Sequence, residues 1–134
     1  MNQTSEQLLS VENLSTGYAG VPVVRELNIH LNEGEVVALL GPNGAGKTTT
    51  LLTISGLIPL LSGNVTVLGE SVDTKNPHTN ARLGLAHVAE DRSLFFNLTV
   101  KENLQLGLRG DKDIQQAGLG KALDLLPALR PLMD

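Results

Sequence analysis

The sequence predicts an α/β fold, and three observations indicate it. The first is a strand, a loop and a helix in succession, formed by an apolar run over residues 35–40, a glycine-rich segment over 41–46 and a helix-competent segment over 47–55. The second is a pair of upstream segments with strand-like patterning, over 8–14 and 23–31. The third is a change to helical spacing in the last third of the chain.

The two upstream segments predict an antiparallel β element attached to the strand over 35–40. Residues 23–31 place Val24, Leu27, Ile29 and Leu31 at apolar positions. The Asn-Glu-Gly triplet over 32–34 has turn chemistry, so we expect the segment to fold back onto the strand over 35–40. A nucleotide-binding strand of this kind is normally central and parallel and covered on both faces, and its usual neighbours would include strands that this sequence does not contain.

Downstream of the loop, the pattern predicts short alternating elements. Gly56 is expected to end the helix, and residues 63–69 read as a strand. The Asn76-Pro77 pair predicts the start of a short helix through Arg82, which leads to a strand over 83–88.

Helical signals dominate the end of the chain. Thr99 and Glu102 have the spacing of a capping box and predict a helix to about Leu108. Residues 111–126 carry leucine and isoleucine at roughly helical spacing, and Pro127 is expected to end or kink that helix.

The segment GPNGAGKTT, residues 41–49, fits the phosphate-binding pattern G-x-x-x-x-G-K-[ST] at every fixed position. Its glycines allow successive N–H groups to converge on one concavity, and the following helix directs its unpaired N–H groups to the same anion. Lys47 is expected to reach the β- and γ-phosphates, Thr48 to ligate Mg²⁺, and Thr49 to donate to the α-phosphate. The residues expected to hold the nucleotide here are Gly41, Pro42, Asn43, Gly44, Ala45, Gly46, Lys47, Thr48 and Thr49. The alternative is a glycine-rich turn that caps an ordinary helix, with Lys47 a solvated surface charge.

Composition limits the class of protein. The 134 residues suffice for one modest domain or a piece of a larger one, and 41% hydrophobic residues suffice for a core. A net charge of −4 argues against a nucleic-acid partner. The absence of cysteine from the sequence suits a reducing compartment, and the first residues do not resemble a signal peptide, so we expect a cytoplasmic location. His30, His78 and His87 have no ligand spacing, so a histidine metal site is not expected.

Features around the loop resemble the ATP-binding-cassette (ABC) ATPases. Tyr18, in the segment STGYAG, is similar to the aromatic residue that stacks on adenine in that family. The run from Gly34 to Glu70 looks like the opening segment of the family over its whole length. The alternative for Tyr18 is a surface tyrosine that packs over the sheet.

The segment over 86–104 resembles the part of the family that touches Mg²⁺ and the attacking water and relays nucleotide state to the membrane subunit. Glu90 stands there where the general pattern has glutamine, which is similar to the subgroup that serves branched-chain amino acid uptake; Ala89 and Asp91 depart from that subgroup. Glu90 is therefore a candidate catalytic residue and, with Thr48, a candidate Mg²⁺ ligand. Two alternatives stay open: Glu90 as the terminal carboxylate of a Mg²⁺-binding strand, or as a solvated loop acid paired with Arg92.

The resemblance implies a P-loop NTPase of ABC type that uses ATP and Mg²⁺, works with an integral-membrane permease and a second ATPase subunit, and sits peripherally on the inner face of the cell membrane. It implies a nucleotide-binding core over 1–92 and the start of a helical subdomain over 93–134. The family continues with a signature loop, a catalytic glutamate and a switch histidine, which this sequence does not contain, so no general catalytic base is identified. We therefore expect the chain to be marginally stable, to associate, or to be a fragment of a longer gene product. We also expect it to be unable to hydrolyse ATP alone. The alternatives are a non-catalytic nucleotide-binding module and a fragment of a soluble ABC-type ATPase.

Overall fold

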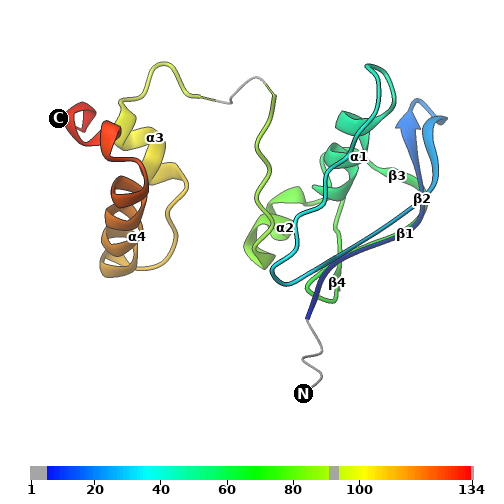
Figure 1. Ribbon diagram of the computed structural model, residues 1–134, viewed down its shortest axis with the longest axis horizontal. Coiled ribbons are helices and arrows are strands. Elements are labelled where there is room, and N and C mark those ends of the chain that lie inside the picture. The colour runs from blue at the N-terminus through cyan, green and yellow to red at the C-terminus, as the bar shows by residue number, and fades with distance from the viewer. Residues whose placement is uncertain (1–5, 91–93, 134) are drawn as a thin grey trace. The chain divides into compact units, whose positions relative to one another are not determined.

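The computed structural model describes residues 6–90 and 94–133. They fall into two compact units that divide between His87 and Val88 (Figure 1).

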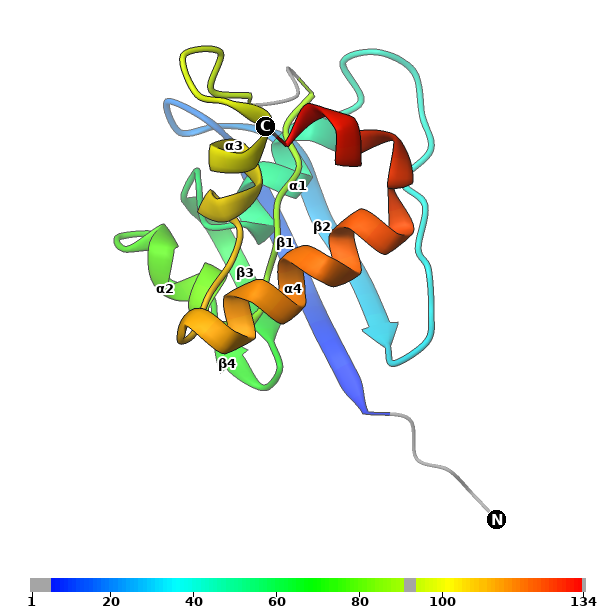
Figure 2. The same ribbon diagram turned by 90° about the vertical axis from the view of Figure 1, so that its left-hand side faces the viewer.

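The first unit is built around a four-stranded antiparallel sheet with the strand order β2-β1-β3-β4. Its strands are β1 (Gln7–Tyr18), β2 (Val21–Asn32), β3 (Leu60–Val67) and β4 (Glu70–Ser71). Figure 2 shows β1 and β2 running side by side, and Ala19 and Gly20 join them. Both turn residues have positive φ angles, 50° and 78°, which suits a two-residue hairpin between strands with a right-handed twist.

Helix α1 (Lys47–Ile54) lies against β1 and β2 and closes the small core. That core consists of the buried side chains of Val11, Leu14, Ile54 and Val65. The buried positions of α1 are mostly threonines. Two of them donate to backbone carbonyls one turn earlier, Thr50 to Gly46 at 2.9 Å and Thr53 to Thr49 at 2.8 Å. This polar but satisfied helix face explains how a short helix with weak amphipathicity is held next to the sheet.

Helix α2 (Pro77–Leu83) is attached to the end of α1 through one buried amide. Asn80 is 1% exposed and accepts a hydrogen bond from the Asp73 N–H. Its own NH₂ donates to the carbonyls of Ser55 and Asp73. The short helix predicted from Asn76-Pro77 is therefore confirmed, as are both upstream strands, the helix after the loop and the strand after Gly63.

Two predicted strands are wrong in the described part of the chain. Residues 35–40 form no regular element and pair with no described strand, and residues 84–88 are not a strand either. The Asn32–Gly34 turn forms, with the Glu35 N–H donating to the Asn32 carbonyl, but β2 folds back onto β1 and not onto residues 35–40. A strand exists only where a neighbour accepts its backbone hydrogen bonds. No parallel pair forms among the described residues, and Val36 is left 96% exposed.

The second unit contains helices α3 (Val100–Leu106) and α4 (Lys112–Leu125) and the 3₁₀ helix η1 (Pro127–Leu132). The predicted capping box is present, because Glu102 N–H donates to the Thr99 hydroxyl and the Glu102 carboxylate accepts from the Thr99 N–H. The Thr99 backbone, and then its side chain, hold the pKa of Glu102 below its usual value. Pro127 ends α4 as predicted.

One asparagine of α3 fixes the chain that precedes this helix. The Asn103 carboxamide oxygen accepts from the Phe95 N–H, and its NH₂ donates to the carbonyls of Phe95, Leu98 and Thr99. The turn that it closes holds Phe96 with 91% of its surface exposed. Within residues 6–90 and 94–133, no helix combines the length and the apolar character that crossing a membrane requires.

Candidate phosphate-binding site

The glycine-rich loop connects residues 35–40 to α1, and its backbone turns sharply at two glycines. Gly44 and Gly46 have φ angles of 83° and 84°, in the left-handed region that favours glycine. The turn is closed by one internal hydrogen bond, from the Ala45 N–H to the Pro42 carbonyl at 3.2 Å. Pro42 has no N–H, so its contribution is the carbonyl and a fixed backbone angle.

The N-terminus of α1 has no group of the protein on its first turn to neutralise its partial positive charge. Its N-cap is Gly46, which has no side chain to act as a cap, and the first turn carries no acidic residue. Among the described residues, the N–H groups of Gly44, Gly46, Lys47 and Thr48 donate to no acceptor. Unpaired N–H donors at the positive end of a helix dipole are suited to the oxygen atoms of a phosphate.

Lys47, the first residue of α1, turns its ammonium group back over the loop. Its Nζ donates to the carbonyl oxygens of Gly41 and Pro42, each at 2.8 Å. The cation is therefore held above the same segment as the free N–H groups. This brings the charge and the amide donors together on one short stretch of chain.

The threonines after Lys47 differ in exposure. The side chain of Thr48 is exposed, which leaves its hydroxyl accessible to a cation, whereas Thr49 is only 6% exposed. The oxygen of Thr48 suits Mg²⁺, a cation that takes few protein ligands and keeps several waters. The assignment of Thr49 to the α-phosphate stays a prediction.

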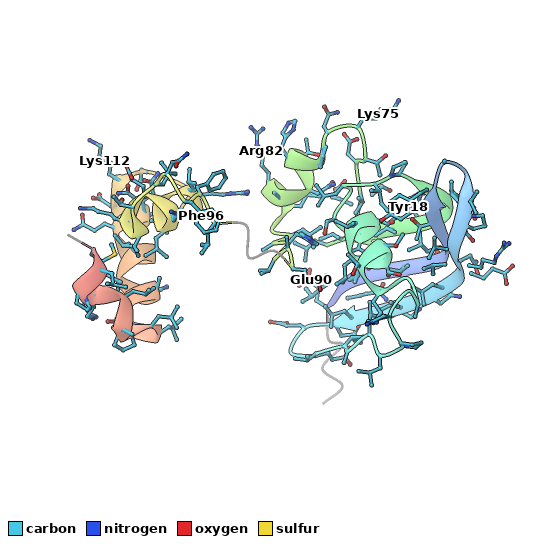
Figure 3. All side chains as sticks on the ribbon, turned by 90° about the horizontal axis from the view of Figure 1, so that it is seen from above. Tyr18, Lys75, Arg82, Glu90, Phe96 and Lys112 are labelled. Carbon is cyan, nitrogen blue, oxygen red and sulfur yellow. The ribbon has the colours of Figure 1, made fainter. Side chains whose placement is uncertain are left out.

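Tyr18 is the last residue of β1 and lies at the end of the β1–β2 hairpin, where it pairs with Val21 (Figure 3). Tyr18 is 53% exposed, so part of its surface is accessible to a ligand. Tyr18 and the loop belong to the same compact unit. Its role as a base-stacking residue stays a prediction.

Glu90 lies in the second unit and is exposed. Arg92, the partner in the alternative interpretation, and Asp91 lie outside the described residues. The catalytic and Mg²⁺-binding roles of Glu90 therefore stay predictions.

Sequence reasoning missed the residues that hold the loop against the sheet. A Cβ atom on Gly46 would lie 2.3 Å from Cγ2 of Val24, so the end of the loop is packed directly on β2. Thr16 and Thr53 join β1 to α1 through a buried hydroxyl pair. No sequence pattern identifies such contacts, because they depend on which strand lies behind the loop.

Turn glycines, unpaired amides, a lysine and an exposed threonine thus give this α/β protein the features expected of a phosphate-binding loop. Residues 24–130 match the ABC transporter family. The chain therefore belongs to the ABC transporter family.

Curated relatives agree with this assignment. The chain is 37% identical, over 110 residues, to the lipopolysaccharide export system ATP-binding protein LptB of Escherichia coli strain K12; the match covers 81% of this chain and 46% of LptB. It is 37% identical over 124 residues to the high-affinity branched-chain amino acid transport ATP-binding protein BraG of Pseudomonas aeruginosa, covering 92% and 53%. A probable branched-chain amino acid transport ATP-binding protein, LivF of Archaeoglobus fulgidus, is 34% identical, with coverage of 94% and 54%. The chain thus spans about half the length of these relatives.

Solved structures confirm the predicted ABC ATPase type of α/β fold. An ATP-binding subunit of an ABC transporter superposes with a TM-score of 0.66 at 37% identity, covering 74% of this chain and 40% of that chain. A subunit of the ABC transporter complex cbiONQ of Clostridium perfringens gives a TM-score of 0.76 over 96% of this chain and 53% of that chain. Its identity of 24% supports the fold alone.

Proposed function

We propose that this chain is the ATP-binding front part of an ABC-type ATPase that energises transport across a membrane. The observation that carries the proposal is the loop over 41–48, where unpaired amides, a helix N-terminus and the Lys47 ammonium converge. ATP would be held with its polyphosphate on this loop and its base against Tyr18. Bound Mg²⁺, with the Thr48 hydroxyl as a ligand, would neutralise charge on the phosphate oxygens.

Each residue of the site has a separate task in this proposal. The loop amides hold and orient the phosphates without a conformational penalty, because their turn exists before the ligand arrives. Lys47 exchanges two carbonyl acceptors for phosphate oxygens, which are anionic and form stronger hydrogen bonds. Residues 1–92 would supply this nucleotide-binding core and residues 93–134 the start of a helical subdomain, with Glu90 near their junction as the residue that senses nucleotide state.

The transported solute has two candidates, each favoured by a curated relative. BraG and LivF are named for branched-chain amino acid transport, and LptB for lipopolysaccharide export. The acidic residue at position 90 favours the amino acid candidate. In either case the chain would act with an integral-membrane permease and a second ATPase subunit, on the inner face of the cell membrane. Copurification with a permease, followed by uptake of labelled leucine, separates the two.

The test of nucleotide binding is calorimetric titration of MgATP into the full chain. Lys47→Ala should weaken binding about 10–100-fold, because it removes a charged donor worth roughly 1.5–3 kcal/mol. Lys75→Ala is the matched control, since Lys75 is an exposed lysine of the same unit outside the loop. Equal affinity of the Lys47→Ala variant and the unmodified chain would contradict the proposed site.

A further inference from the structure

A chain of hydrogen bonds runs from the centre of the sheet to the first turn of α1. The hydroxyl oxygens of Thr16 on β1 and Thr53 on α1 are 2.6 Å apart, and both residues are fully buried. Thr53 donates its one proton to the Thr49 carbonyl at 2.8 Å. The proton between the two threonines therefore belongs to Thr16, and the order of donors is Thr16 to Thr53 to Thr49.

The same part of β1 is joined to the phosphate loop by a second route. Thr16 pairs with Val24 across the sheet. Cγ2 of Val24 occupies the place where a side chain on Gly46 would start, 2.3 Å from its ideal Cβ. Thr16 is thus connected to the end of the loop through packing and to the helix after the loop through its hydroxyl.

Tyr18 follows Thr16 by two residues on the same strand. The register of β1 with β2 shifts between Thr16 and Gly17, so Tyr18 is tied to Thr16 by two residues of chain and not by a shared face of the sheet. Gly17, between them, permits the close approach of β2, because a Cβ there would lie 1.9 Å from the Val21 carbonyl oxygen. The end of β1 is therefore held by β2 at Gly17 and by α1 at Thr16.

We infer that Thr16 and Thr53 are positioning residues that set the separation between Tyr18 and the phosphate loop. This inference rests on the proposed function, in which the ring and the loop hold the two ends of one nucleotide. A valine of the same shape would bury as well at either position without the cost of desolvating a hydroxyl. The hydroxyl pair fixes the position of α1 along β1, because a hydrogen bond of 2.6 Å tolerates little sliding of one element past the other.

The test compares two magnesium-loaded ligands on the full chain by calorimetry. ATP has a base and a polyphosphate, whereas inorganic tripolyphosphate has no base. Thr16→Val and Thr53→Val should each weaken ATP about 5–10-fold, since a displaced ring loses stacking, and should change tripolyphosphate by less than about twofold. Thr53→Ser keeps the hydroxyl and should restore ATP affinity. Thr66→Val, at a half-buried position of β3 with no hydrogen bond from its hydroxyl to a described residue, is the control and should change neither.

A double-mutant cycle tests whether the loss of ATP affinity in Thr53→Val acts through Tyr18. If the hydroxyl pair acts through the ring, Thr53→Val should weaken ATP no further in a Tyr18→Ala background. Should Thr53→Val not fold, Thr16→Val takes its place, because it leaves the Thr53 donor bonded to Thr49.

Equal losses for both ligands, no loss for either, or a full effect without Tyr18 would overturn the inference. Failure of the proposed function looks different. In that case the unmodified chain binds neither ligand, or it binds both and Tyr18→Ala leaves ATP affinity unchanged, and the positioning role then fails as well.

Discussion

Gly46→Ala tests whether the loop is packed on the sheet or merely turns next to it. Two costs add at this position. The φ angle of 84° lies in the left-handed region, where an L-residue loses roughly 1–2 kcal/mol relative to glycine. The new Cβ would also lie 2.3 Å from Val24 Cγ2, about 1.2 Å inside the ~3.5 Å optimum for two carbon atoms. Valine is stiff at χ1, so relief requires backbone movement and costs about 1–3 kcal/mol.

The variant should therefore lower the free energy of unfolding by roughly 2–5 kcal/mol. Gly44→Ala is a matched control, because its φ is 83° and nothing lies within 4 Å of an added Cβ. It should cost only the backbone term of about 1–2 kcal/mol. Urea unfolding without nucleotide, followed by circular dichroism, measures the free energy of unfolding of both variants. Val24→Ala in the Gly46→Ala background should recover part of the loss, whereas equal destabilisation by the two alanine variants would refute the packing argument.

Three other variants test the elements around the site. Asn80→Ala should lower the free energy of unfolding by about 2–4 kcal/mol, because three backbone groups lose a buried partner, whereas exposed Asn64→Ala should change it by less than about 0.5 kcal/mol in the same urea assay. The pKa of Glu102 is lowered in the folded chain, so its contribution to α3 is complete above the ordinary value of 4.5 and is lost as the pH falls through the lowered pKa. Carbon-13 titration of that carboxyl should show a midpoint below 4.5 that moves toward the ordinary value in Thr99→Ala; an unmoved midpoint would contradict the capping account. Asn103→Leu removes four hydrogen bonds from the preceding turn and should speed chymotryptic cleavage at the adjacent phenylalanines roughly fivefold or more, with unchanged cleavage as the contrary result.

Local chemistry explains which elements the sequence predicted well. The turn of the glycine-rich loop, the capping box at Thr99 and the end of α4 before Pro127 each depend on neighbouring residues. A local sequence pattern is therefore sufficient to predict them. The strand over 35–40 failed for the opposite reason. Its apolar residues are typical of a buried strand, but pairing depends on a neighbour that no described residue supplies.

The site divides in the same way. The ligand class and the donors proposed for it come from the motif, because the proposal depends on backbone amides and one lysine. The support behind it could not be predicted: Val24 reads as one more apolar strand residue, and Thr16 and Thr53 are 37 positions apart in the chain. Only the register of β1 with β2 and the packing of α1 bring these residues together.

The folded-back ammonium of Lys47 has a consequence for ligand discrimination. Because the cation already satisfies two neutral oxygens of its own backbone, an incoming molecule has to outcompete them. A sugar, an amide or another uncharged compound offers acceptors no better than those carbonyls and gains nothing by displacing them. In the proposed site, only a densely anionic ligand would offer Lys47 better acceptors than these carbonyls, so the loop would discriminate against neutral metabolites on charge alone.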